Sequence, residues 1–300
     1  MKKIILLALV FMSATLANGQ ILYKISGNGQ KKASYIIGTH HLVDETFASQ
    51  IPGIDKAIKK TKQVYGEVVM SHLMSPDTLQ MMQEAMMLPE GTTIKDFLDP
   101  EHYDKLNELL VDLIGINLEN PLLLPLSRMK PSAIENQIEV LIYLKEYPGK
   151  LDPNKGIDTY FQNHAIQEKK TVGGLESCKF QIEMLFSTTI EQQVESFNCL
   201  LDNLEANKKQ LIVLTDAYRK QDAQAIVDAM NMKFGNECDN LSQKELDKIL
   251  TMRNNNWLAI MPDIMKQAPT LFVVGSAHLL GETGVITLLR KAGYTVEPVK

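Results

Sequence analysis

The sequence predicts an α/β (α+β) fold in which a central β-sheet begins with an N-terminal hairpin and is flanked by helices. Short apolar runs of strand length, rich in β-branched or aromatic residues, lie near both ends of the chain, and long stretches with helical periodicity lie between them. Two of the runs stop at a glycine and carry a histidine three positions later, as Gly38-x-x-His41 and Gly275-x-x-His278. Apolar runs of this length are typical of strands buried on both faces.

The amino-acid composition limits the kinds of function to be considered. The chain has 300 residues, 45% hydrophobic and 22% charged, which is enough to bury a large core. Its formal net charge is -5 and its pI about 5.7. Because no basic stripe is present, we expect no nucleic-acid partner.

The N-terminus predicts a secretory signal peptide over residues 1–19. Lys2 and Lys3 precede an apolar run, and Ala17-Asn18-Gly19 has the small-x-small pattern of a cleavage site. The run is too short to span a bilayer, and no other segment is long and apolar enough. The alternative is a buried N-terminal helix. We expect a bacterial protein, periplasmic or secreted, with no transmembrane segment after cleavage.

Three cysteines follow, Cys178, Cys199 and Cys238. An oxidising compartment permits one disulfide and leaves one free thiol, and the spacing does not select the pair.

Residues 21–26 and 33–38 read as two strands of a hairpin around a glycine-rich turn at 27–30. A helix is expected from Gly53 to Thr61, followed by a core strand over 64–70 with Glu67 in its middle. Burying a carboxylate is costly unless a cation, a metal or several donors lie nearby. The alternative places Glu67 at an exposed edge.

Residues 76–147 have a helical pattern, and the prolines at 121–131 predict a loop or a helix junction before a helix over 136–147. The methionine pairs Met81-Met82 and Met86-Met87 suit either an adaptable hydrophobic groove or simple core packing.

In the second half, a helix opens at Gly156 with Asp158 in its first turn, and residues 170–176 read as a strand ending in Glu176. The alternative for Glu176 is a cap on the helix that starts at Ser177. Residues 178–265 predict four or five helices, and Arg253 on one of them is either functional or solvated. A strand at 271–275, a helix at 285–292 and an edge strand at 294–298 close the chain.

The candidate site gathers the polar residues that follow these strands: His41, Glu67, Glu176 and His278. In an open α/β sheet such residues face the crevice where ligands bind. Two imidazoles and two carboxylates are a suitable ligand set for a first-row divalent metal, and either glutamate could serve as general base. Arg253 could stabilise a developing oxyanion and polarise the scissile carbonyl.

These residues resemble the TraB/GumN family, which includes the Tiki metalloproteases, across 21–299. The resemblance implies an erythromycin-esterase/ChaN-like fold, with a mixed sheet and a helical insertion at about 76–165 of a single domain spanning 20–300. It also implies a metal-dependent protease using manganese or cobalt, with zinc as an alternative. When the family's functional positions are carried over to this sequence, the resemblance implies that His41, His278 and Glu67 are the site residues, with Glu176 and Arg253 in supporting roles. The match is carried by residues 22–29, 34–41, 64–67, 156–161, 173–177, 253–254 and 274–281.

We therefore expect a periplasmic or secreted metal-dependent hydrolase whose substrate is a peptide or a small molecule. Two alternatives stay open: a non-catalytic envelope protein that binds haem, iron or another small ligand, and a metal-free esterase in which His41 activates water with Glu67. The sequence does not indicate the oligomeric state.

Overall fold

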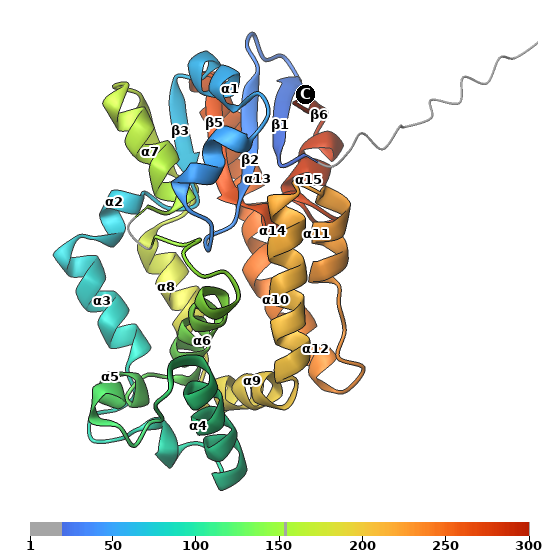
Figure 1. Ribbon diagram of the computed structural model, residues 1–300. Coiled ribbons are helices and arrows are strands. Elements are labelled where there is room, and N and C mark those ends of the chain that lie inside the picture. Colours follow the sequence, from blue (N-terminus) through green and yellow to red (C-terminus); the bar gives the residue numbers. More distant parts are fainter. Residues whose placement is uncertain (1–19, 153–154, 300) are drawn as a thin grey trace, which may run out of the picture.

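The computed structural model describes residues 20–152 and 155–299, so the predicted signal peptide lies outside the described residues. Within that range a six-stranded mixed sheet occupies one end of the molecule and a helical lobe the other (Figure 1). The sheet order is β4-β3-β5-β2-β1-β6. The strands are β1 (Leu22–Gly27), β2 (Ser34–Thr39), β3 (Gln63–Gly66), β4 (Thr171–Gly174), β5 (Thr270–Gly275) and β6 (Tyr294–Pro298).

The predicted hairpin is confirmed as the antiparallel pair β1–β2. Its turn uses positive φ angles at Gly27 (82°), Asn28 (47°) and Gly29 (76°), a conformation that glycine and asparagine tolerate best. The closing strand is also confirmed, since β6 pairs antiparallel with β1 at the sheet edge.

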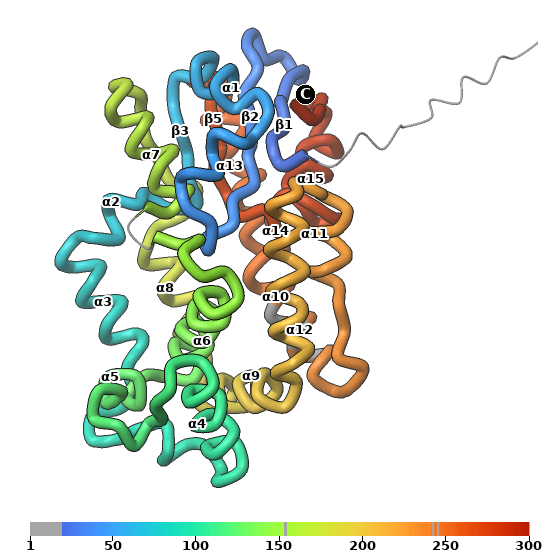
Figure 2. Tube along the Cα trace, in the orientation of Figure 1, coloured from blue at the N-terminus to red at the C-terminus, as the bar shows by residue number. Residues whose placement is uncertain are grey.

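The two strands with Gly-x-x-His endings are parallel neighbours. Their register runs from Tyr35 opposite Leu271 to Thr39 opposite Gly275. Figure 2 shows that these segments from opposite ends of the chain, one blue and one red, lie side by side. Because β3 and β4 continue the parallel part beyond β5, four strands end at the same edge, in the order β4, β3, β5, β2.

The strands around the two acidic residues are shorter than predicted. Glu67 was expected in the middle of a strand, but β3 ends at Gly66, and residues 67–69 lead into the short helix α2 (Met70–Leu73). The Gln162 side chain binds the backbone on either side of Val69 and turns the chain away. The amide of Glu176 still donates to the carbonyl of Glu67 at 2.9 Å, so the two acids follow neighbouring strands side by side.

Helices cover both faces of the sheet. One face packs residues of η1, α1 and α7, including Phe47, Ala57 and Phe161, and also receives Tyr218. The other face packs Trp257 of α13 and residues of α15. These elements are η1 (Glu45–Gln50), α1 (Ile54–Lys60), α7 (Ile157–Gln167), α11 (Ala223–Met230), α13 (Arg253–Gln267), α14 (Ser276–Leu279) and α15 (Val285–Lys291).

The helical lobe comprises α3 to α6 and α8 to α10, so segments before and after β4 build it together (Figure 1). Met81, Met82 and Met86 pack against Ile182 and Phe186, as the core alternative predicted. The bounds are α3 (Pro76–Met86), η2 (Ile94–Asp96), α4 (Pro100–Ile114), η3 (Pro121–Leu123), α5 (Leu124–Ser127), α6 (Pro131–Glu146), α8 (Cys178–Phe186), α9 (Ile190–Asp202) and α10 (Leu204–Arg219).

Two helical predictions need correction. The helix expected from 136 begins at Pro131, because proline is well tolerated in the first turn, where no intrahelical donor is needed. The stretch 178–265 holds six α-helices, α8 to α13, rather than four or five. In addition, the π-helical η4 (Asp247–Met252) joins α12 (Cys238–Leu246) directly to α13.

One disulfide and one free thiol are present, as predicted: Cys199 pairs with Cys238, and Cys178 is free. The disulfide ties α9 of the helical lobe to α12. None of the helices among residues 20–152 and 155–299 has the length and apolar character needed to cross a membrane.

The disulfide should stabilise the fold. Cys199→Ser should lower the free energy of unfolding by about 2–4 kcal/mol, because the crosslink closes a 39-residue separation in the unfolded chain. Urea titrations of the oxidised protein would measure the loss. The control is Cys178→Ser, and equal stability of the two variants would contradict the prediction.

Candidate functional site

Three of the four residues predicted from strand ends, His41, Glu67 and His278, converge on Gly275, the last residue of β5. The fourth, Glu176, joins them through Arg253. A β-carbon built on Gly275 would lie 3.3 Å from Glu67 Oε1, 3.6 Å from His278 Cδ2 and 4.0 Å from His41 Nε2. The parallel register of β2 and β5 brings the two imidazoles to this point, and β3 brings the carboxylate. Only a glycine leaves this space open at the sheet edge.

Arg253, at the start of α13, is the centre of a buried ion cluster. Its side chain is 6% exposed and pairs with Glu67, 8% exposed, and with Glu176, 6% exposed. Arg253 Nη2 donates to Glu67 Oε2 and, at 2.6 Å, to Glu176 Oε1. Gln181 Nε2 bridges both carboxylates at 3.2 Å, and Trp257 Nε1 donates to Glu176 Oε2 at 3.1 Å.

Every nitrogen of the Arg253 guanidinium is engaged by the protein. A guanidinium has five N–H donors. Nε donates to both oxygens of Glu176 at 3.1 Å, and Nη1 donates to the Ile249 carbonyl at 3.1 Å and to His278 Nε2 at 2.9 Å. With Nη2 shared by Glu67 and Glu176, no donor is left for a substrate carbonyl, so in this arrangement Arg253 holds the acids together.

The pKa of Glu67 is governed by opposing effects. Burial raises it, but nearby cations and the N–H of Gly275, which donates to Oε1 at 2.8 Å, outweigh burial and lower it to about 2. His278 contributes only when it is protonated, so at neutral pH Arg253 and His41 are the cations that act. Glu67 is therefore ionised at neutral pH and a weak base.

His278 is a neutral, buried imidazole of defined tautomer. Burial, opposed by Glu67 and reinforced by Arg253, lowers its pKa to about 3. Because a guanidinium only donates, Nε2 must be the acceptor, and the proton lies on Nδ1, which faces Asn254 Oδ1 at 2.7 Å. The Asn254 amide in turn donates to the Thr283 carbonyl at 3.0 Å, which fixes its orientation.

His41 differs from His278 in exposure and in charge. Its Nδ1 lies 2.9 Å from Asp158 Oδ2, and Thr39 Oγ1 donates to the other oxygen of that carboxylate at 2.7 Å. The Asp158 charge raises the pKa of His41 above its ordinary value, with burial opposing. Because 68% of the His41 side chain is exposed, water screens the pair and limits the rise. Nε2 faces the position beside Gly275.

The donor atoms do not fit a metal ion as they stand. His278 Nε2, Glu67 Oε2 and the oxygens of Glu176 are all bonded to Arg253, whose positive charge takes the place a cation would need. The donor atoms nearest to the position beside Gly275 are His41 Nε2 and Glu67 Oε1. Among the described residues, no three His, Cys, Asp or Glu side chains are arranged to hold a metal.

Asp158, Gln181, Asn254 and Trp257 belong to the site but were not predicted to do so. Asp158 lies in one of the stretches that carry the family resemblance, but by itself it stood out as an acid in the first turn of a helix, a position that the helix dipole explains. Asn254 and Trp257 follow Arg253 on α13, but one helix carries many polar and aromatic residues that never meet. For Gln181 the sequence offered no signal.

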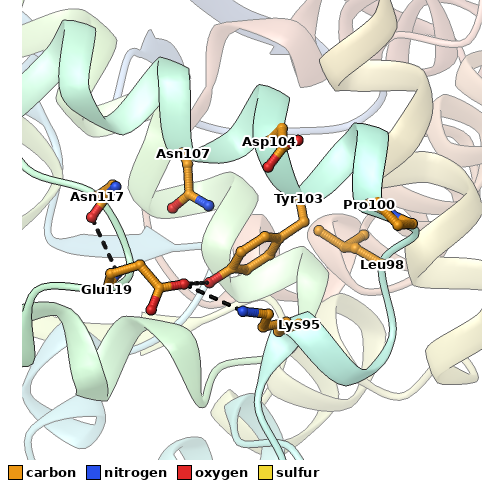
Figure 3. A pocket seen from close by; sticks show the side chains of 8 residues that line it. All are labelled: Lys95, Leu98, Pro100, Tyr103, Asp104, Asn107, Asn117 and Glu119. Carbon is orange, nitrogen blue, oxygen red and sulfur yellow. Dashed lines mark hydrogen bonds and ion pairs between the residues drawn. The ribbon is translucent and has the colours of Figure 1, made fainter.

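A separate cavity of about 470 Å³ lies in the helical lobe, away from the strand ends (Figure 3). Three of its polar groups are paired with one another: Glu119 Oε1 accepts from Tyr103 at 3.1 Å and from Lys95 at 3.4 Å. The candidate site is assigned to Gly275 instead, because Glu67, His41 and His278, all with shifted pKa values, meet there.

Comparison with known proteins gives a family match and distant relatives. The model of the TraB/PrgY/gumN family matches residues 21–298. A protein named metalloprotease TIKI1 from Danio rerio is 24% identical over 88% of this chain and 60% of its own length. Its namesake from Xenopus tropicalis is also 24% identical, over 88% of this chain and 59% of its own. The chain thus spans about 60% of these relatives. No solved structure matches significantly.

Removing the central cation should destabilise the protein. Arg253→Met leaves two buried carboxylates without their cation and should lower the free energy of unfolding by about 3–5 kcal/mol at pH 7. Urea titration measures this change, and the exposed Arg128→Met is the control, expected to change stability by less than about 0.5 kcal/mol.

The loss of unfolding free energy in Arg253→Met should be smaller in acid than at pH 7. The lowered pKa of Glu67 stabilises the wild type above pH 4.5, and this contribution is lost as the pH falls toward about 2. In Arg253→Met the pKa of Glu67 rises, so at pH 3.5 its carboxyl group is protonated and no longer a buried charge. A deficit that is the same at pH 7 and pH 3.5 would contradict this account.

Proposed function

The chain belongs to the TraB/PrgY/gumN family, and from that premise we propose that it is a hydrolase whose proton-transfer group is His41, oriented by Asp158. The observation that carries the proposal is the convergence of His41 Nε2 and Glu67 Oε1 on the open position beside Gly275. His41 is a base with an exposed ring, and Glu67 is a hydrogen-bond acceptor held in a fixed position.

The arrangement suits activation of a water molecule. Asp158 holds the Nδ1–H tautomer of neutral His41, so that Nε2 presents its lone pair. Glu67 Oε1 accepts from the Gly275 amide and has a second lone pair for a water O–H. A water held by Glu67 and His41 would transfer one proton to His41 Nε2 as its oxygen attacks a carbonyl carbon. His41 would then return the proton to the leaving group.

This assignment changes the expected roles of two residues. Glu67 was a candidate general base, but its lowered pKa makes it a weak base. Its carboxylate is better suited to orient the water by accepting a hydrogen bond than to remove a proton from it. Arg253 was expected to polarise the scissile carbonyl, but its donors are committed to Glu67, Glu176, His278 and Ile249. We propose that it keeps Glu67 ionised and in place.

The proposed substrates are peptides, or small molecules with a hydrolysable carbonyl bond. The names of the distant relatives support peptides. The proposed location is the periplasm or outside the cell, because the Cys199–Cys238 disulfide is typical of oxidising compartments. Haem or iron binding gains no support from the methionines of α3, which pack against α8.

A divalent metal, manganese, cobalt or zinc, is our second proposal, supported by the relatives named as metalloproteases. The donor atoms as they stand do not fit such a metal. His41 Nε2 and Glu67 Oε1 could hold it in this arrangement, and His278 and Glu176 could join them only if Arg253 released them.

The pH dependence should identify the base. His41 acts when neutral, so kcat should rise with pH through a pKa above the ordinary 6.5. Asp158→Asn removes the charge that raises this pKa; the rise should move to lower pH, and the plateau should fall about 10²- to 10⁴-fold. Chromogenic peptide amides and esters provide the assay.

The matched control for Asp158→Asn is Asp55→Asn. Asp55 is also the second residue of its helix, but it is exposed and far from the site. The dependence of kcat on pH in Asp55→Asn should therefore equal that of the wild type. An unshifted profile in Asp158→Asn would remove His41 from the proposed role.

Chelation separates the two proposals. We expect activity to persist after EDTA treatment and to disappear in His41→Ala, because the water is held by protein groups. If EDTA abolishes activity and manganese, cobalt or zinc restores it, with metal content measured by mass spectrometry, the metal-dependent reading replaces the metal-free one. Activity unchanged in His41→Ala would contradict both.

A further inference from the structure

Helix α7 presents two polar side chains toward the site from one face. Asp158 and Gln162 are four residues apart and therefore lie one above the other on the helix. Asp158 holds the segment that follows β2, through Thr39 and His41. Gln162 holds the segment that follows β3, and no step of the proposed reaction uses it.

Gln162 is buried, with 3% of its surface exposed, and both ends of its amide are bonded to backbone. Oε1 accepts from Met70 N at 2.9 Å, and Nε2 donates to the Val68 carbonyl at 2.8 Å. These two bonds span the three residues directly after Glu67. Helix α2, which starts at Met70, has no buried residue and gives this segment little packing of its own.

The strand itself makes room for this amide. A β-carbon on Gly66 would lie 2.2 Å from Gln162 Nε2, so the glycine before Glu67 is needed for the Gln162 side chain to reach its partners. Gly66 and Gln162 thus form a matched pair, which explains why β3 ends where it does.

We propose that Gln162 is a positioning residue that sets the place of the Glu67 carboxylate relative to His41. Helix α7 would then fix the spacing of both groups that hold the attacking water, Asp158 acting on one and Gln162 on the other. This inference rests on the proposed function for its catalytic consequence, but the positioning itself is independent of any activity.

The test compares two buried glutamines that bind at opposite ends of β3: Gln162, which reaches from α7 to the residues after the strand, and Gln63, the first residue of the strand. Gln162→Met keeps the length of the side chain and removes both bonds. The control is Gln63→Met: Gln63 is 4% exposed and donates to Ile264 O at 2.9 Å and Thr270 Oγ1 at 2.8 Å, at the end of β3 remote from Glu67. Both variants lose a buried amide, but only one loses contact with the Glu67 segment.

Kinetics gives the first readout. Gln162→Met should lower kcat about 10- to 100-fold, because small displacements of a reacting group are costly, and should leave KM within about twofold. Gln63→Met should keep kcat within about twofold of the wild type. Equal losses of kcat in the two variants would overturn the inference.

Amide hydrogen exchange gives a second readout that needs no substrate. Exchange at residues 67–70 should be at least about tenfold faster in Gln162→Met and unchanged in Gln63→Met, because exchange reports local opening. If Gln162→Met does not fold, Gly66→Ala displaces the same amide and should give the same local effect. Unchanged exchange at 67–70 overturns the positioning role, whereas absence of hydrolysis in the wild type overturns only the proposed function.

Discussion

The buried guanidinium of Arg253 is the interaction on which the rest of the site depends. Two neighbouring parallel strands are followed by acids that lie side by side, and two adjacent buried carboxylates would otherwise repel each other and lose hydration without compensation. Arg253 satisfies both and also bonds His278 Nε2. Arg253 also helps to lower the pKa of Glu67, and it reinforces the burial that keeps His278 neutral. Because Arg253 is the first residue of α13, its ion pairs join that helix to the strand ends.

The site divides into a closed half and an open half. Glu176 and His278 are buried and each is bonded to Arg253, which makes all three unavailable to a ligand. His41 is exposed, and its partner Asp158 is fixed by Thr39. Glu67 belongs to both halves, because one oxygen meets Arg253 and the other faces the open position beside Gly275. A rigid shell that presents a few free atoms is how preorganised sites are generally built.

Much of the fold was predictable because its signals are local. The hairpin, the strands over β2 and β5 and the closing edge strand each show their apolar pattern and turn residues in a short window. The end of β3 was not predictable, because Val68 to Met70 continue the apolar pattern of Val64 and Tyr65. What ends the strand is Gln162, almost one hundred residues away, which no local pattern reveals.

The sequence by itself determined that two Gly-x-x-His endings follow buried strands and that acids follow two others, because hydrophobic periodicity and glycine are read residue by residue. Only the tertiary structure decided what those groups do to one another. The parallel register of β2 and β5 set the imidazoles at one point, and the docking of α7 and α13 chose Asp158 for His41 and Arg253 for Glu67. Ion pairing and pKa depend on distances of a few ångströms between remote segments, and such distances exist only once the chain has packed.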